Sequence, residues 1–257
     1  MHELDGKKIK DLLPDGYKGL EVIVYDCIDS TNTEAKRLFK KDGNNMLVCA
    51  AEQTAGRGRS GKSFFSPEKT GVYFSLVIAR KMPLSIAVKA TAAAAVAVVE
   101  AVEELTGKKP MIKWVNDIFL DGKKVCGILT EAISSDEKNL ADGLIVGIGI
   151  NISTVDFPDE IKEIAGSLGE NSVNKNQLIA IICEKLLEFS EDLENPYVVG
   201  KYRDSSLVIG REITYERNGE AFTATALDID ENFGLVVRKS DGGKETLTSG
   251  EISIKVK

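Results

Sequence analysis

Residues 53–63 read QTAGRGRSGKS, and the surroundings of this stretch decide between two classes of fold. Its letters fit both the P-loop pattern GxxxxGKS and the dinucleotide-binding pattern GxGxxG. Each pattern requires a strand before the loop and a helix directly after it, whose N-terminus binds phosphate. A strand-like run precedes the loop at residues 47–51, but residues 64–71 (FFSPEKTG) contain proline and glycine and lead into another strand. The sequence therefore argues against a P-loop ATPase and against a dinucleotide-dependent dehydrogenase.

The same stretch reverses the charge of the chain locally. The whole chain carries 33 Lys and Arg against 40 Asp and Glu, a net charge of −7, which disfavours general nucleic-acid binding. Arg57, Arg59 and Lys62 nevertheless lie close together, with no acid between Gln53 and Pro67. Guanidinium groups bind phosphate and carboxylate through two-point contacts. The stretch predicts a lid that closes over an anion, with a solvated surface loop as the structural alternative.

Residue counts exclude several chemistries. The single histidine is His2, which disfavours Ser-His-Asp triads, Cys-His pairs and histidine metal sites. The cysteines form no C-x-x-C pair, and each lies in an apolar run typical of a small buried side chain: Cys27, Cys49, Cys126 and Cys183. Residues 1–20 lack the apolar core of a signal peptide, and the apolar run at residues 90–99 is too short to span a membrane. We expect a cytoplasmic protein that does not bind membranes.

The periodicity predicts an α+β domain over residues 1–205. Strands are expected at residues 20–28, 46–51, 72–79, 111–114, 125–133 and 144–151. Helices are expected at residues 32–41, 86–105 and 177–193. Thr31 and Glu34 fit a capping box for the first helix, Gly107 ends the second, and Asn174 caps the third. Asp121-Gly122 predicts a two-residue hairpin.

The pattern changes after residue 205. Residues 206–257 contain short strand patterns separated by turn sequences such as Asn218-Gly219 and residues 241–243 (DGG). Short strands at this spacing predict a small β-barrel as a second domain.

Two further stretches have unusual composition. Residues 113–117 (KWVND) place a tryptophan between Lys113 and Asn116. An edge strand that ends in a turn would explain them, but Lys113, Asn116 and Lys124 could also face a polyanion such as a nucleotide with Mg²⁺. Residues 147–151 (GIGIN) interrupt an apolar strand with two glycines, which indicates either a bulge or the close approach of a ligand or another backbone.

Four pieces in fixed order resemble the biotin–protein ligase family: DSTN, QTAGRGRSGK, KWVNDI followed by KKVCGILTE, and GIGIN. The resemblance extends from about Leu20 to the C-terminus. It implies a class II synthetase-like catalytic domain, with a mixed sheet packed with helices, followed by an SH3-like barrel. It also implies an ATP-dependent enzyme that activates biotin to biotinyl-5′-AMP, releases pyrophosphate, and transfers biotin to a lysine of a biotin carboxyl carrier protein.

The resemblance also assigns residues. Biotin contacts are implied for Ser30, Thr31, Asn32, Gln53, Arg57, Gly58, Arg59, Lys124 and Gly127. Contacts with ATP or the adenylate are implied for Arg59, Phe64, Lys113, Asn116 and Asn151. Arg57, Lys113 and Lys124 are the catalytic candidates, together with Arg59 as a further cation, whereas metal ligands stay unassigned. Asp117 is a candidate base for the carrier lysine. This chain departs from the family pattern at Val115, Phe64 and Lys62, where the family has proline, tryptophan and arginine.

Several alternatives remain at this stage. Family members that also repress transcription carry a winged helix-turn-helix of about sixty residues before the catalytic domain, and residues 1–20 cannot hold one. The sequence is that of a monofunctional ligase or of part of a longer chain, and we expect no DNA binding by these residues. A homodimer and the identity of the carrier stay open. Competing functions are a lipoate-type ligase, a biotin-sensing regulator without catalysis, and a P-loop ATPase.

Overall fold

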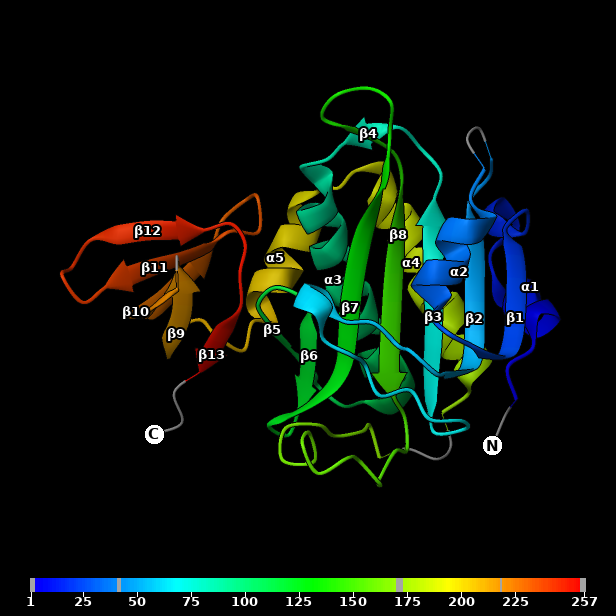
Figure 1. The fold of residues 1–257 in the computed structure, drawn as a ribbon, viewed down its shortest axis with the longest axis horizontal. Coiled ribbons are helices and arrows are strands. Elements are labelled where there is room, and N and C mark those ends of the chain that lie inside the picture. Colours follow the sequence, from blue (N-terminus) through cyan, green and yellow to red (C-terminus); the bar gives the residue numbers. More distant parts are fainter. Residues whose placement is uncertain (1–2, 41–42, 170–172, 218, 255–257) are drawn as a thin grey trace.

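A computed structural model describes residues 3–40, 43–169, 173–217 and 219–254. An eight-stranded mixed sheet lies at the centre (Figure 1), and its path of seven strands has the order β1-β2-β3-β8-β7-β6-β5, with the short β4 paired to β8. The bounds along the chain are β1 Glu21–Ile28, β2 Met46–Gln53, β3 Gly71–Ile78, β4 Met82–Pro83, β5 Met111–Lys113, β6 Asp117–Leu120, β7 Lys123–Ser134 and β8 Leu140–Asn151. Only the β1–β2 pair is parallel among these described strands. The six predicted strands are thus present.

Helices cover both faces of this sheet. On one face, α1 (Gly6–Leu12), α3 (Ile86–Thr106) and α4 (Lys175–Glu191) pack over the main core, and α5 (Pro196–Asp204) packs on α3. Residues 90–99 of α3 are all buried, as an apolar surface on every side of a helix requires. On the other face, α2 (Thr31–Leu38) covers a second, smaller core and lies on the same side as residues 54–70, in front of the sheet in Figure 1.

The start of α2 differs from the predicted capping box. Ser30 is the N-cap, and Thr31 is already the first helical residue. The Thr31 side chain contacts Gln53, while Glu34 accepts hydrogen bonds from Tyr25 and Arg37. The local pattern was wrong here because both side chains are used by tertiary contacts. The helix ends at Leu38, and the predicted end at Lys41 lies outside the described residues, as does His2.

The other local signals agree better with the structure. Gly107 ends α3 in a left-handed conformation, with φ of 69°, and Asn174 caps α4 through its side chain. The turn residues Asp121 and Gly122 have φ of 50° and 78°, as the predicted hairpin requires. Three cysteines are buried, but Cys27 is exposed because β1 is an edge strand. Within the described residues, no helix has the length and apolar character needed to cross a bilayer.

The C-terminal part forms a separate antiparallel sheet, at the left of Figure 1. Its strands are β9 Glu212–Arg217, β10 Glu220–Ile229, β11 Leu235–Lys239, β12 Lys244–Leu247 and β13 Ile252–Ile254. They pair in the order β12-β11-β10-β9-β13, and no pairing among the described strands closes this sheet into the expected barrel. The short strands and their turns are as the sequence predicts, but the observed sheet is open.

The unusual tryptophan joins the two sheets. Trp114 is buried, and its indole N–H donates to the carbonyl of Phe233 at 2.8 Å. The Tyr202 hydroxyl donates to the Val115 carbonyl at 3.1 Å, and its ring packs edge-on against Phe233 with centroids 5.4 Å apart. Backbone bonds between Ile112 and residues 205–207 complete the junction. The strand that carries Lys113 is therefore fixed by the C-terminal sheet.

Candidate functional site

The predicted lid contains no α-helix. Residues 54–70 hold one 3-10 turn at Arg59–Gly61, and β3 follows. Ser60 and Gly61 adopt positive φ values of 53° and 75°, which turn the chain back on itself. The Gly58 N–H then bonds the Lys62 carbonyl, so the loop closes as a flap. This geometry lacks the helix N-terminus that a P-loop or a dinucleotide site needs.

Three glycines leave a depression on the sheet face below the lid. Gly127 of β7 pairs with Gly149 of β8, and Gly147 lies two residues before Gly149, on the same face. A Cβ atom at Gly147 would lie 1.9 Å from the Asn32 Oδ1 atom. The register is continuous here, so the glycines mark no bulge. We call Gly127, Gly147 and Gly149 the glycine trough.

Phe64 lies over this trough. A Cβ at Gly149 would lie 2.5 Å from its ring, and one at Gly127 would lie 3.0 Å from it. The trough thus accepts a side chain from the end of the lid as well as Asn32 from α2. The remaining pocket has a volume of about 20 Å³, the space of about one water molecule. A ligand that fills the trough beneath this ring requires Phe64 to move.

Most of the predicted biotin contacts meet at this pocket. Its lining consists of Ser30, Thr31, Asn32, Gln53, Arg57, Phe64, Gly127, Leu129, Gly147, Ile148 and Gly149. Six of the nine residues assigned to biotin are among them, whereas Gly58, Arg59 and Lys124 are not. Phe64, which was assigned to the adenylate, faces the same pocket as the biotin residues. Sequence positions from 30 to 149 therefore form one site.

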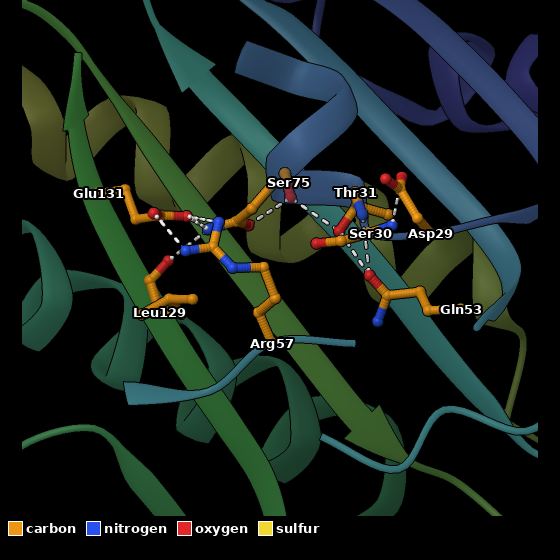
Figure 2. Close-up of polar contacts among 9 residues, drawn as sticks. Asp29, Ser30, Thr31, Gln53, Arg57, Ser75, Leu129 and Glu131 are labelled. Atoms are coloured by element: carbon orange, nitrogen blue, oxygen red, sulfur yellow. Dashed lines mark hydrogen bonds and ion pairs between the residues drawn. The ribbon is translucent and has the colours of Figure 1, made fainter. Parts of the chain in front are cut away.

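A hydrogen-bond network crosses the pocket (Figure 2). The backbone N–H and the hydroxyl of Thr31 both donate to the Gln53 Oε1 atom, at 2.8 and 3.2 Å. The Ser75 Oγ atom lies 2.8 Å from the Thr31 hydroxyl and 2.7 Å from the Asn32 Oδ1 atom. The Asn32 Nδ2 group donates to the Glu131 carboxylate at 2.8 Å. These contacts fix the orientation of the Thr31, Asn32, Gln53 and Ser75 side chains on the pocket floor.

Both ends of the lid join this network. The Arg57 guanidinium makes a two-point contact with Glu131, at 2.9 and 3.0 Å (Figure 2). The Gln53 Nε2 group donates to the Ser66 hydroxyl at 2.8 Å, and that hydroxyl donates to the Phe64 carbonyl at 2.9 Å. The position of the lid is thus coupled to the polar groups below it.

Asp29 fixes the start of α2 from outside the pocket. Its carboxylate accepts the Ser30 N–H at 2.7 Å and a two-point contact from Arg37. The Arg37 hydrogen bond holds the pKa of Asp29 below its ordinary value. The start of α2 is therefore held by Asp29 on the outside and by Gln53 on the pocket side.

Sequence reasoning missed two members of the network. Ser75 is fully buried in the apolar strand VYFSLVI, where an isolated serine was the available signal. Glu131 ends the quoted motif KKVCGILTE, but no role was assigned to it. The interaction partners of both residues lie more than forty positions away in the sequence, so local patterns could not identify them.

A second polar cluster lies beside the pocket. The Arg59 guanidinium donates to the Asn116 Oδ1 atom at 2.9 Å, and the Asn116 Nδ2 group donates to the Ile128 carbonyl, next to Gly127. Lys124 forms an ion pair with Asp117 at 2.7 Å. The lid cation Arg59 and the KWVND turn thus lie together, and the family resemblance assigns both to contacts with ATP or the adenylate.

The cations of the site differ in whether a carboxylate forms an ion pair with them. Arg57 is paired with Glu131, Lys124 with Asp117, and Lys62 with Glu251 of the C-terminal domain. The hydrogen bond from Lys62 lowers the pKa of Glu251. Among the residues that the structure describes, Arg59 and Lys113 have no carboxylate within 4 Å. The site therefore has two cations without an ion-pair partner, and the Asp117 and Glu251 carboxylates act on Lys113 only from a greater distance.

Lys113 is the more unusual of these two cations. It is half-buried, and its Nζ atom lies 5.6 Å from the centroid of the Phe119 ring. Burial lowers its pKa, because removal of water disfavours the charged ammonium. An anion placed beside Lys113 would restore that lost stabilisation.

Asn151 offers an oxygen without a partner at the end of β8. The residue is buried, its Nδ2 group donates to the Gly166 carbonyl at 2.9 Å, and its Oδ1 atom has no partner among the described residues. Among all residues that the structure describes, no three His, Cys, Asp or Glu side chains lie close enough together to form a metal site. A Mg²⁺ ion at this site would thus be held largely by ligand phosphates and water, with an amide oxygen from the protein.

The fold and this pocket define a class of protein that binds a small ligand under an arginine-bearing lid, next to an anion site. Comparison with known proteins identifies the family. The chain belongs to the biotin/lipoate A/B protein ligase family, whose profile matches residues 24–151, and the biotin protein ligase C-terminal domain matches residues 208–255. The resemblance found in the sequence is confirmed.

Relatives and solved structures agree with this assignment. The bifunctional ligase/repressor BirA of Bacillus subtilis (strain 168) is 34% identical over 245 residues, which cover 92% of this chain and 74% of that protein. The biotin–[acetyl-CoA-carboxylase] ligase of Mycobacterium tuberculosis is 26% identical over 261 residues, 96% of this chain and 93% of the relative. The biotin protein ligase from Aquifex aeolicus in complex with biotin and ATP superimposes with a TM-score of 0.76 and 30% identity, covering 91% of this chain and 98% of that one.

Proposed function

We propose that this chain is an ATP-dependent biotin–protein ligase. It activates biotin to biotinyl-5′-AMP with release of pyrophosphate and then transfers biotin to a lysine of a biotin carboxyl carrier protein. The observation that carries the proposal is the pocket over the glycine trough, with two cations beside it, Arg59 and Lys113, that form no ion pair in the described structure. The relatives named above as biotin ligases and the similar structure with biotin and ATP support it.

The first half-reaction needs positive charge more than it needs a base. The carboxylate of biotin is already ionised at pH 7, so it can attack the α-phosphate in line without losing a proton. The transition state gathers negative charge on the phosphate oxygens, which fixed cations stabilise. Arg59 and Lys113 are free of carboxylate partners in the described structure and would contact these oxygens. The scarcity of histidine in this chain fits such a mechanism.

Arg57 and Lys124 would act differently. Both were assigned to catalysis from the sequence, but each is neutralised by a carboxylate partner. Arg57 lines the pocket and would bind the substrate there. The Lys124 side chain runs within 3.4 Å of the Cβ position of Gly127, so it would contact the biotin tail and keep Asp117 away from the phosphates.

Mg²⁺ would enter with the phosphates of ATP. The Asn151 Oδ1 atom is the protein oxygen that fits it, and the ion would supply further positive charge to the phosphate oxygens. In the second half-reaction the carrier lysine must be neutral to attack the mixed anhydride. Asp117 is engaged by Lys124 and Asn116, so the geometry gives no support to its assignment as the base.

The cellular compartment and the oligomeric state remain expectations. We expect it in the cytoplasm, where ATP is present and where buried unpaired thiols such as those of Cys49, Cys126 and Cys183 stay reduced. A homodimer remains an expectation from the family resemblance, and light scattering on the purified protein would measure it.

Mass spectrometry of a carrier domain tests the proposal. Incubation with the protein, ATP and biotin should add one biotinyl group to the carrier lysine, and biotin should be required for ATP–pyrophosphate exchange. Lipoate in place of biotin identifies a lipoate-type ligase. Tight biotin binding without exchange indicates a regulator, and ATP hydrolysis without biotin indicates an ATPase. Each of these three results would overturn the proposal.

A further inference from the structure

We propose that Glu131 is a positioning residue for the substrate ring. It cancels the charge of Arg57 and fixes the direction of the hydrogen bonds on the pocket floor, so that this end of the pocket accepts an uncharged polar ring. The inference rests on the proposed function, because biotin combines an uncharged ureido ring with an anionic carboxylate.

The contacts of Glu131 carry the first step. One carboxylate oxygen accepts from Arg57 at 3.0 Å, and the other accepts from Arg57 at 2.9 Å and from the Asn32 Nδ2 group at 2.8 Å (Figure 2). Two-point contacts between guanidinium and carboxylate fix the planes of both groups. The side chains of Glu131 and Arg57 are 28% and 47% exposed, so water screens part of their attraction and the two-point geometry is what orients them. Glu131 therefore holds a lid residue and a floor residue in one arrangement.

The second step concerns the direction of the hydrogen bonds. A carboxylate only accepts, so Asn32 must turn its NH₂ group toward Glu131 and its Oδ1 atom toward Ser75. The Ser75 hydroxyl can then donate to Asn32, and the Thr31 hydroxyl remains directed at Gln53. A glutamine at position 131 could donate to Asn32 as well as accept from it, so the amide of Asn32 would no longer have one orientation. Glu131 thus sets which pocket atoms donate and which accept.

The third step concerns charge. Arg57 and Glu131 together leave this end of the pocket neutral, whereas Arg59 and Lys113 have no such partner in the described structure. A carboxylate or phosphate is therefore stabilised more strongly beside Arg59 and Lys113, which have no ion-pair partner among the described residues, than beside Arg57. Without the charge of Glu131, Arg57 would become a third free cation and would compete for the anionic end of the substrate. The glutamate therefore separates the two ends of the site by charge.

Calorimetric titration of biotin tests this role. Glu131→Gln should weaken biotin binding by about tenfold, the loss expected for one charge-assisted contact. The same change should have a much smaller effect in an Arg57→Met background, because Glu131 acts largely through that arginine. Titration of ATP should give the same affinity within twofold, since general damage to the fold would weaken both ligands. The urea unfolding midpoint of each variant checks the fold.

Glu34→Gln is the matched control. Glu34 also pairs with an arginine, Arg37, but it does not line the pocket, so biotin affinity should stay within twofold. The inference is overturned if Glu131→Gln leaves biotin affinity unchanged, if ATP affinity falls equally, or if the full effect persists without Arg57. Biotin titration does not depend on turnover. A wild-type protein that binds biotin but shows no exchange would therefore contradict the proposed function alone.

Discussion

The two ends of the pocket differ in how their polar groups are satisfied. At the Arg57 end, Glu131 compensates the guanidinium, and Thr31, Asn32, Gln53 and Ser75 bond to one another. At the other end, the partner of Arg59 within the described part of the chain is the neutral amide of Asn116, and Lys113 lies near the Phe119 ring.

We propose that this difference separates recognition of the ligand ring from stabilisation of negative charge. Groups that already have partners are rigid and neutral, and they suit recognition of an uncharged ring. Cations without carboxylate partners raise the local potential, and they stabilise an anion more strongly because no internal partner must be displaced. The same lid supplies one arginine to each end, so we propose different roles for Arg57 and Arg59, which are only two positions apart.

The largest expected effect comes from Lys113. Lys113→Met removes a half-buried cation at the anionic end, and biotin-dependent ATP–pyrophosphate exchange should fall by about 10²–10³-fold, as for the loss of one preorganised stabilising group. Lys113 does not line the pocket, so the biotin affinity should be nearly unchanged. Exchange kinetics measure both quantities. A loss below threefold would remove Lys113 from the catalytic cations.

Adjacent lysines provide the second comparison. Lys124→Ala should lose most of the exchange activity, about tenfold or more, because Asp117 would be left unpaired beside the phosphates. Lys123→Ala should stay within twofold, since the Lys123 Nζ atom bonds the Glu163 carbonyl away from the pocket. Equal effects of the two substitutions would mean that the wrong lysine has been placed in the site.

The glycine trough allows a test of shape. Gly147→Ala would force Asn32 from its place and should destabilise the fold by about 1–3 kcal/mol, as for an overpacked core, with weaker biotin binding. Gly200→Ala is the control, because no atom lies within 4 Å of its Cβ position in α5, and alanine there should stabilise by about 0.4–1 kcal/mol. Urea unfolding measures both. Equal stability of the two variants would contradict the close approach of Asn32.

The smallest effect is a shift in pH dependence. Burial lowers the pKa of Lys113, so the lysine loses its charge as pH rises through a value below the ordinary value of about 10.4. The kcat/KM for ATP should therefore decline on the alkaline side before that pH. Lys113→Arg keeps its charge throughout and should move the decline upward, even if its absolute rate is lower. If kcat/KM declines at the same alkaline pH in Lys113→Arg as in the wild type, the decline belongs to another titrating group.

The sequence predicted much of this site because its motifs are contiguous. Ser30, Thr31 and Asn32 come from one short motif, and the paired glycines mark the trough directly. The six strands could also be predicted, since β-branched and aromatic runs lie between clear turn sequences.

What the sequence could not predict depends on distant contacts. The Arg57–Glu131 pair spans 74 positions, so the basic lid looked uniformly charged. The place of Trp114 between two polar residues had no local explanation, because its partner, Phe233, lies in a turn of the C-terminal domain. The capping box failed since Thr31 and Glu34 are bound by β2 and β1 residues. In each case the sequence does not show which distant residue the side chain will bond to.

The most direct test of the two-ended pocket compares exchange kinetics of Lys113→Met and Glu131→Gln in one experiment, with biotin varied at saturating ATP. Lys113→Met should lower kcat while the KM for biotin stays within twofold. Glu131→Gln should raise the KM for biotin by about tenfold while kcat stays within threefold. If both variants change the same parameter in the same proportion, the ends of the pocket do not have separate roles.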